Sequence, residues 1–151
     1  MQDLLATIIS WIAITADLPA AEQHPKIAFV ASAEIGAIRS AIVQRTASGA
    51  APMRNTTPAP SVYAFYDEQS GTIYLPDTWS ETSPADVSIL VHETVHHLQS
   101  LAGSKYACPA ARERQAYEAQ ARWLAMFEME IHEAFEIGPM AMLFLTRCVP
   151  P

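Results

Sequence analysis

Hydrophobic and polar residues alternate along this chain with periods that predict several helices and three short strands. The first hydrophobic positions recur at helical spacing: Leu4, Leu5, Ile8, Trp11 and Ile12. Such spacing predicts an amphipathic helix that packs on a core and ends before Pro19. The apolar part of a secretory signal is the alternative interpretation, but no basic residue precedes Lys26, so we favour the helix.

Strand-forming residues are concentrated in three segments: 26–30, 62–66 and 72–75. Residues 67–71, between the second and the third segment, are typical of a turn, so we expect these two strands to form an antiparallel hairpin. Pro76 should end the last strand because proline has no backbone donor. The fold class that follows is α+β, mainly helical, with a small antiparallel sheet.

Capping residues indicate where two of the helices begin. Ser32 is placed to cap a helix over residues 33–45. Ser83 is followed by proline at the first helical position and by Asp86 three residues later, which together predict a capping box. The helix that starts there should end near Gly103.

The rest of the chain contains a predicted loop and two further helices. Residues 46–60 are rich in proline and polar residues, which predicts a surface excursion or a lid. A long helix should begin at Pro109 and run towards Ile137, before Gly138 breaks it and a short helix follows over 140–146. The apolar positions of the long helix are expected to lie in the core: Trp123, Phe127, Ile131 and Phe135.

Composition and charge narrow the choice of function. A chain of 151 residues with half of them hydrophobic fits one domain, 1–151. The net charge of -7 argues against a nucleic-acid partner. The longest apolar run, residues 4–16, is too short to span a membrane. Cys108 and Cys148 either form a disulfide in an exported protein or remain two thiols in the cytoplasm, so the compartment stays open.

The candidate chemistry lies in the helix that follows Ser83. Residues 92–96 read His-Glu-Thr-Val-His, a match to H-E-x-x-H. One helical turn separates His92 from His96, so both imidazoles leave the same face and can hold one zinc ion. Glu93 follows the first ligand and is placed to reach a water on that metal. His97 points about 100° away from His96 and is expected at the surface or behind the ligands.

Catalytic zinc usually takes a third protein ligand and keeps a fourth position for water. Glu113, 17 residues after His96, leaves room for a turn and a return along the next helix. Ala116 would let that helix approach the first one closely. Glu118 is the competing choice, but it lies about 140° around the helix from Glu113, so only one of the two can face the metal. We favour Glu113.

The pattern resembles the gluzincin group of zinc metallopeptidases, in which H-E-x-x-H on one helix is joined by a glutamate on the next. Many members continue that glutamate as E-x-x-A-D, where this chain has Glu113, Ala116 and Tyr117. Residues 92–99 also resemble the H-E-x-x-H-H-L-Q core of small uncharacterised bacterial proteins. The resemblance covers about residues 72–122, which is a third of the chain.

The resemblance implies a role for each matched residue. His92, His96 and Glu113 would bind Zn²⁺, and Glu93 would be the general base. Tyr117, at the position where aspartate is common, is a candidate for stabilising the oxyanion or for contacting a ligand from behind. The sequence does not choose between it and the other tyrosines for the oxyanion: Tyr63, Tyr66, Tyr74 and Tyr106. The strand before the motif would be the edge strand that pairs with substrate: Thr72, Ile73, Tyr74 and Leu75. A strand that simply covers the core is the alternative.

Three hypotheses follow from these observations. The leading one is a zinc-dependent peptidase acting on a peptide or protein substrate. The second is a zinc-stabilised binding or regulatory module without turnover, and the third is a protein without metal, with the two histidines as ordinary helix residues. Of the remaining histidines, His24 is expected to be exposed, and His132 is expected on a solvated acidic face.

Overall fold

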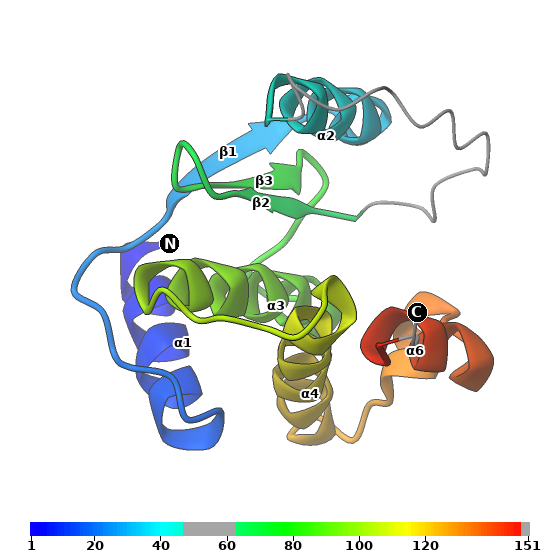
Figure 1. The fold of residues 1–151 in the computed structure, drawn as a ribbon. Coiled ribbons are helices and arrows are strands. Elements are labelled where there is room, and N and C mark those ends of the chain that lie inside the picture. Colours follow the sequence, from blue (N-terminus) through cyan, green and yellow to red (C-terminus); the bar gives the residue numbers. More distant parts are fainter. Residues whose placement is uncertain (47–62, 149–151) are drawn as a thin grey trace.

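Three short strands form one sheet, and helices pack on both of its faces (Figure 1). The computed structural model describes residues 1–46 and 63–148, so most of the predicted loop 46–60 lies outside the described residues. The fold is α+β and mainly helical, as expected. Its elements run in the order α1 (Gln2–Thr15), β1 (Lys26–Val30), α2 (Ser32–Thr46), β2 (Phe65–Asp67), β3 (Thr72–Pro76), α3 (Pro84–Leu101), α4 (Pro109–Ala125), α5 (Ile131–Phe135) and α6 (Pro139–Thr146).

The sheet is mixed, with the strand order β1-β3-β2. The predicted hairpin is present, because β2 pairs antiparallel with β3 and places Phe65 opposite Tyr74. On its other side β3 pairs parallel with β1, in a register that sets Ile27 opposite Ile73. The strand Thr72–Pro76 is therefore central, and the prediction that it is a substrate-binding edge strand is wrong. Residues 72–74 of β3 have a strand on either side, so a peptide cannot add to the sheet along them.

Alternation along β3 divides the core between the two faces of the sheet. Ile73 and Leu75 are fully buried on the side of α3, in a cluster that also includes residues of α1 and α4. Tyr74 faces the other way and stacks on Phe65, with α2 covering both through Ile35. The larger cluster therefore lies between the sheet and α3, which fixes the helix that carries the motif.

The helix α3 passes through the centre of the molecule and is buried on every side over residues 87–99. Its first turn is capped as predicted, since the Ser83 side chain accepts a hydrogen bond from the backbone N–H of Asp86 at 3.2 Å. The Asp86 carboxylate accepts from the N–H of Ser80 instead of closing the box on Ser83. Gly103, at a φ of 59°, follows the C-terminus, where a left-handed residue is favoured.

The long helix predicted from Pro109 to Ile137 ends at Ala125 in the structure. Glu128 adopts a left-handed φ of 57°, and the N–H of Met129 donates to the carbonyl of Leu124. These features form a Schellman motif, which normally carries glycine where this chain has glutamate. Phe127 is 47% exposed and was wrongly assigned to the core, whereas Phe135 of α5 is buried as expected.

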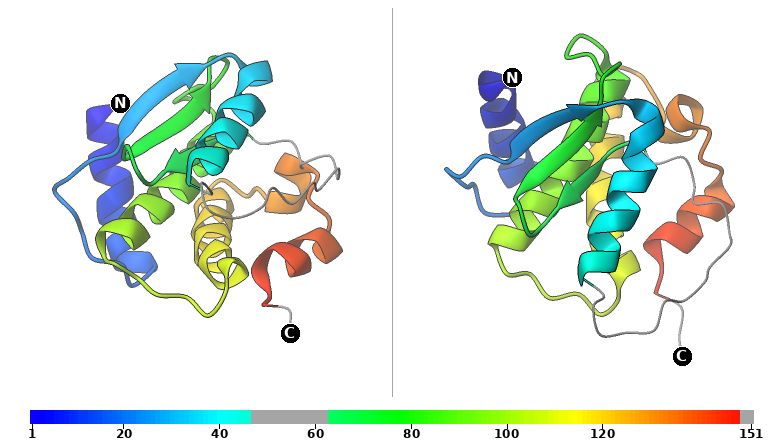
Figure 2. Two further views of the ribbon diagram at one scale, coloured as in Figure 1. Left: turned by 45° about the horizontal axis from the view of Figure 1, so that its top comes forward. Right: turned by 90° about the horizontal axis from the view of Figure 1, so that it is seen from above.

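Helices α5 and α6 lie beside α4, on the side away from α1 (Figure 2). A disulfide between Cys108 and Cys148 joins the end of this region to the start of α4. Of the two interpretations of the cysteines, the structure has the disulfide. Within the described residues, no helix is both long enough and apolar enough to cross a membrane.

Candidate metal centre

Helices α3 and α4 bring two histidines and one glutamate together. His92 and His96 lie one turn apart on α3, and their ring centroids are 5.0 Å apart. The Nε2 atoms of His92 and His96 each lie 3.4 Å from a carboxylate oxygen of Glu113 on α4. Ala116, fully buried one turn after Glu113, permits the close approach of α4. The structure therefore assembles the predicted triad.

The spacing of the triad fits a small tetrahedral cation. Two atoms that each lie 2.0–2.1 Å from zinc at the tetrahedral angle are roughly 3.3–3.4 Å apart. The two nitrogen–oxygen distances match that value, and one ligand atom from each of the three residues lies within 4.8 Å of the others. Glu118, the competing choice, is exposed and lines a pocket with Tyr106 and Gln115 instead.

Each histidine has an inner nitrogen, Nε2, near Glu113 and an outer nitrogen, Nδ1, which lies beside a glutamine side chain. His92 Nδ1 lies 3.0 Å from Gln120 Oε1, and His96 Nδ1 lies 2.9 Å from Gln99 Oε1. The Nε2 groups of both glutamines donate elsewhere, Gln120 to Ser88 and Gln99 to the carbonyl of Arg112. The oxygens must therefore face the imidazoles, and each histidine carries its proton on Nδ1. Each Nε2 then presents a lone pair to Glu113.

The electrostatics of the triad follow from this arrangement. Burial by itself would raise the pKa of Glu113, but the rings of His92 and His96 in their protonated form donate hydrogen bonds to it from Nε2 and add positive charge, which holds this pKa well below the usual range of a carboxyl group. Burial would lower the pKa of His96, but the Glu113 carboxylate and the charge of Glu93 raise it above its usual value. Two imidazole lone pairs and a carboxylate therefore converge on a point that favours a positive charge.

Glu93 and Tyr117 border the triad. Glu93 is 8% exposed and makes no hydrogen bond to any described residue, yet its carboxylate oxygens are not sealed from solvent. The ring of Tyr117 lies 4.6 Å from that of His92, edge to face. Burial, followed by the charges of Glu113 and Glu93, raises the pKa of Tyr117 to about 12. Its hydroxyl is therefore protonated at neutral pH and is free to donate.

A cavity of about 380 Å³ opens beside Glu113, between the start of α4 and α6. Its walls are mainly apolar and include Phe144, Leu145 and the Cys108–Cys148 disulfide, with Arg147 as a basic residue. The side chain of Glu113 is 37% exposed, so the third member of the triad is reached from outside while both histidines are nearly buried. The cavity therefore borders the triad through Glu113, and neither histidine lines it.

The other histidines occupy different environments. His97, expected at the surface or behind the ligands, is 2% exposed on the far side of α3, where it contacts Tyr66 and the carbonyl of Gln23. The expectation of a surface position is wrong because α3 is covered on all sides. His24 is half-buried and pairs with Gln2, so it is less exposed than predicted. His132 is exposed beside Glu130, as expected.

Sequence reasoning missed the two glutamines. Gln99 lies three residues after His96, within reach of its outer nitrogen, and this spacing is a usable signal. Gln120 lies seven residues after Glu113, on the same face of α4, and is 5% exposed. The signal that identifies Gln120 is a polar residue two helical turns after a proposed ligand, on the face of α4 that points into the molecule.

Comparison with known proteins gives one family match. Residues 1–150 match a family model described as Domain of unknown function (DUF6647). No curated protein and no solved structure matches the chain.

Proposed function

We propose that this chain, which belongs to the DUF6647 family, is a zinc-dependent peptidase with His92, His96 and Glu113 as metal ligands and Glu93 as general base. One observation carries the proposal. The outer nitrogen of each histidine donates to a glutamine, so both inner lone pairs face a carboxylate at 3.4 Å. Only a cation or a proton relieves this repulsion. The resemblance of this sequence to gluzincins supports the same three ligands.

Zinc suits this donor set better than other cations. Two imidazoles and one carboxylate, with a fourth position left for water, are the ligands of a well-known class of catalytic zinc site. Calcium and magnesium prefer sites made of oxygen atoms alone. When bound, zinc supplies Lewis acidity and brings the pKa of a coordinated water to about 7.

The protein's own residues then carry the proton transfers. Glu93 takes a proton from the attacking water as the water oxygen bonds to the carbonyl carbon of the substrate. It delivers that proton to the leaving nitrogen as the C–N bond breaks. Tyr117, protonated because its pKa is about 12, donates a hydrogen bond to the developing oxyanion. His92 and His96 would hold the metal through Nε2 while Gln120 and Gln99 fix their rings through Nδ1.

The approach to the site supports a peptide or protein substrate. The cavity beside Glu113 has apolar walls formed by Phe144 and Leu145, which suit a hydrophobic side chain near the reacting bond. Binding by addition to residues 72–74 of β3 is excluded, because they have a strand on either side. Among the described strands, β1 and β2 form the two outer edges of the sheet.

Replacement of Glu93 tests the proposal. E93Q should retain zinc, because Glu93 is not a ligand, while peptide hydrolysis falls by about 10²–10⁴-fold or more. E118Q is the matched control, since Glu118 is an exposed glutamate of α4 and its loss should leave hydrolysis unchanged. Full activity of E93Q would rule out the mechanism.

A non-catalytic zinc-stabilised binding or regulatory module is the second candidate. The position of α6 favours it, because Phe144 and Leu145 of this helix lie against the cavity beside Glu113. The disulfide from Cys148 to Cys108 ties the end of α6 to the start of α4 and so holds α6 in that place. Such a module would hold one zinc ion, lose thermal stability in chelator and cleave no member of a diverse peptide library. Cleavage that depends on Glu93 would exclude it.

We also propose that the protein acts in an oxidising compartment, since disulfides are rare in reducing ones. The Cys108–Cys148 bond motivates this proposal. Protein isolated from its host under conditions that trap thiols should bind no thiol reagent until it is reduced. Labelling of both cysteines without reduction would contradict it.

A further inference from the structure

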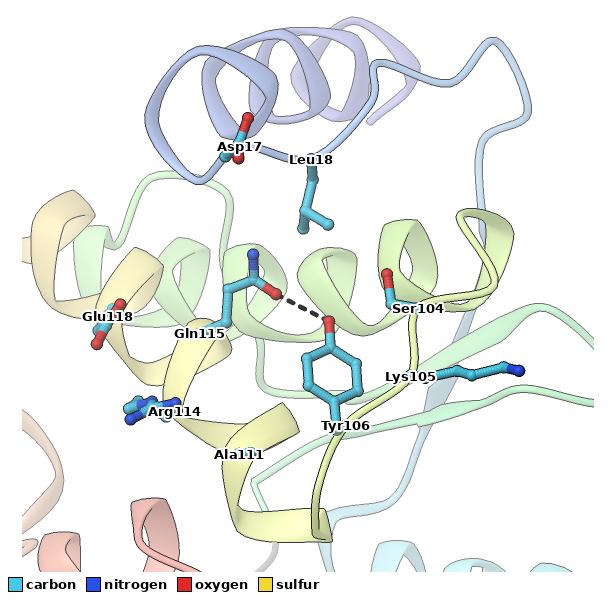
Figure 3. Close-up of a pocket in the computed structure, with 9 residues that line it drawn as sticks. All are labelled: Asp17, Leu18, Ser104, Lys105, Tyr106, Ala111, Arg114, Gln115 and Glu118. Carbon is cyan, nitrogen blue, oxygen red and sulfur yellow. Dashed lines mark hydrogen bonds between the residues drawn. The ribbon is translucent and has the colours of Figure 1, made fainter.

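A chain of hydrogen bonds leads from His96 to the opposite side of α4. Gln99 Oε1 accepts from His96, and Gln99 Nε2 donates to Gln115 Oε1 at 2.9 Å. Gln115 Oε1 also accepts from the Tyr106 hydroxyl at 3.0 Å, and Gln115 Nε2 donates to the carbonyl of Ala16 at 2.8 Å. Figure 3 shows the bond between Tyr106 and Gln115 in a pocket of about 600 Å³.

The groups around Gln99 fix the direction of its amide. Its oxygen accepts from His96 and from Arg112 Nε, and its nitrogen donates to the Arg112 carbonyl and to Gln115. An amide turned by 180° would set its NH₂ against the Nε–H of Arg112 and its oxygen against two acceptors. Gln99 is 2% exposed, so water cannot relieve such a mismatch.

Gln115 is in turn held in one orientation by its own partners. The Ala16 carbonyl can only accept a hydrogen bond, so the nitrogen of Gln115 must face the end of α1 and its oxygen must face Gln99. The network that holds His92 is shorter, because Gln120 donates to Ser88, whose hydroxyl donates within the first turns of α3. Of these two networks, the one that holds His92 stays within α3 and α4, whereas the one that holds His96 also reaches the end of α1.

We propose that Gln115 is a positioning residue for the metal centre, which acts through Gln99 to keep His96 in the tautomer that offers Nε2 to a metal. This inference rests on the metal site of the proposed function and extends it to a side chain that touches none of the three ligands. Partners of a metal-binding histidine typically contribute 10–100-fold to metal affinity, so Q99M should weaken binding by about that factor. The effect of Gln115 is transmitted through one more bond and should be smaller.

Cobalt(II) titration followed by visible absorbance tests the proposal. Q115M should weaken cobalt binding by about 2- to 30-fold, the range expected for residues that couple to a site through a network. In the Q99M background the same substitution should have no further effect, since its route to His96 is already lost. Q69M is the matched control, because Gln69 is an exposed glutamine in the β2–β3 turn, and it should bind cobalt as wild type does.

A second variant separates positioning from a purely structural role. Q115E retains an oxygen that accepts from Gln99, so it should keep cobalt affinity at or above the wild-type value even if it is less stable to heat. Nitrogen NMR of the metal-free protein, at a pH high enough for the His96 ring to be neutral, should show His96 protonated on Nδ1 in wild type and in Q115E, and a mixture of tautomers in Q115M.

Additive effects of Q99M and Q115M, or equal losses of affinity in Q115E and Q115M, would overturn the proposal. These outcomes are distinct from a failure of the proposed function. A wild-type protein that binds neither cobalt nor zinc would refute the metal centre, whereas the tautomer of His96 in the metal-free protein would still report whether Gln115 orients it.

Discussion

His96 and His97 are consecutive residues of α3, both buried, and their environments differ in every other respect. His96 directs one nitrogen to a glutamine and the other to the Glu113 carboxylate. His97 directs one nitrogen to the backbone carbonyl of Gln23 and the other to the hydroxyl of Tyr66. The first histidine therefore has an unsatisfied lone pair beside a negative charge, whereas the second is satisfied as a neutral donor and acceptor.

The two residues are identical side chains, both buried, whose electrostatic environments favour opposite charge states. The pKa of His97 is lowered, first by burial and further by the nearby His24, because no carboxylate faces it. The pKa of His96 is raised despite burial, because Glu113 and Glu93 outweigh it. A group that favours a positive charge in a nearly buried site is a candidate ligand, and a group that resists charge is a candidate core residue.

Substitution by phenylalanine gives the largest expected contrast. H96F removes a proposed ligand and should weaken zinc binding by more than about 100-fold, beyond the 10–100-fold expected from loss of a residue that only hydrogen-bonds to a ligand. H97F leaves the triad intact and should change zinc affinity little. Competition titration with a chromogenic chelator measures the zinc affinity of each variant. Similar affinities of H96F and H97F would contradict the assignment of His96, and not His97, to the metal site.

The two glutamates of α4 extend the comparison to the third ligand. E113Q replaces a charged ligand by a neutral one and should weaken zinc binding by about 10- to 100-fold, as expected from the loss of charge and hydrogen bonds at a metal site. E118Q, on the exposed side of the helix, should bind zinc as wild type does. A loss of zinc in E118Q alone would show that the ligand was wrongly chosen.

The structural role of His97 predicts a loss of stability. H97F removes the two hydrogen bonds that the His97 ring makes with the Tyr66 hydroxyl and the Gln23 carbonyl, and each such bond contributes about 0.5–1.5 kcal/mol. Urea unfolding of the metal-free variant should show a free energy of unfolding lower by about 2 kcal/mol. An unchanged midpoint would mean that His97 does not hold the segment before β1 against α3.

The smallest expected effect is a difference in pH dependence between the two histidines in metal-free protein. The folded-state pKa of His97 is below its unfolded value, so its contribution to stability is present above about pH 6.5 and is lost as the pH falls below it. The folded-state pKa of His96 is raised, so its contribution is present below about pH 6.5 and is lost as the pH rises through the folded value.

Unfolding curves at several pH values check this difference. H97F should remove part of the acid-side loss of stability, and H96F should remove part of the loss at higher pH. Each effect amounts to about 1.4 kcal/mol for a pKa difference of one unit. The Glu113 pKa, held well below its usual range, adds a second loss below about pH 4 that both variants should retain in part. Identical pH profiles for the two variants would contradict the assignment.

Much of the site was predictable because its signals are local. The spacing of His92 and His96 fixes their common face, and the Ser83 cap with the following proline fixes the start of their helix. Glu113 and Glu118 point in different directions on any helix, so only one of them could face the metal. Glu113 was favoured because its distance from His96 leaves room for a turn and because Ala116 permits a close approach of the helices. The disulfide could be named as one of two alternatives, since a chain with two cysteines allows only one pairing.

The features that were missed depend on contacts between distant segments. The central position of β3 results from parallel pairing with β1, which no local pattern encodes. The end of α4 depends on Met129 returning to Leu124 through a left-handed Glu128, where the usual glycine signal is absent. The burial of His97 depends on Gln23 and Tyr66, which reach α3 from two other parts of the chain.

X-ray absorption at the zinc edge of the zinc-loaded protein tests the central claim most directly. The account predicts one zinc ion per chain, with two imidazole nitrogens and carboxylate or water oxygens at about 2.0–2.1 Å and no sulfur. In H96F the spectrum should lose one imidazole or the protein should lose the metal. A sulfur neighbour at about 2.3 Å, or a wild-type protein that takes up no stoichiometric zinc, would contradict it.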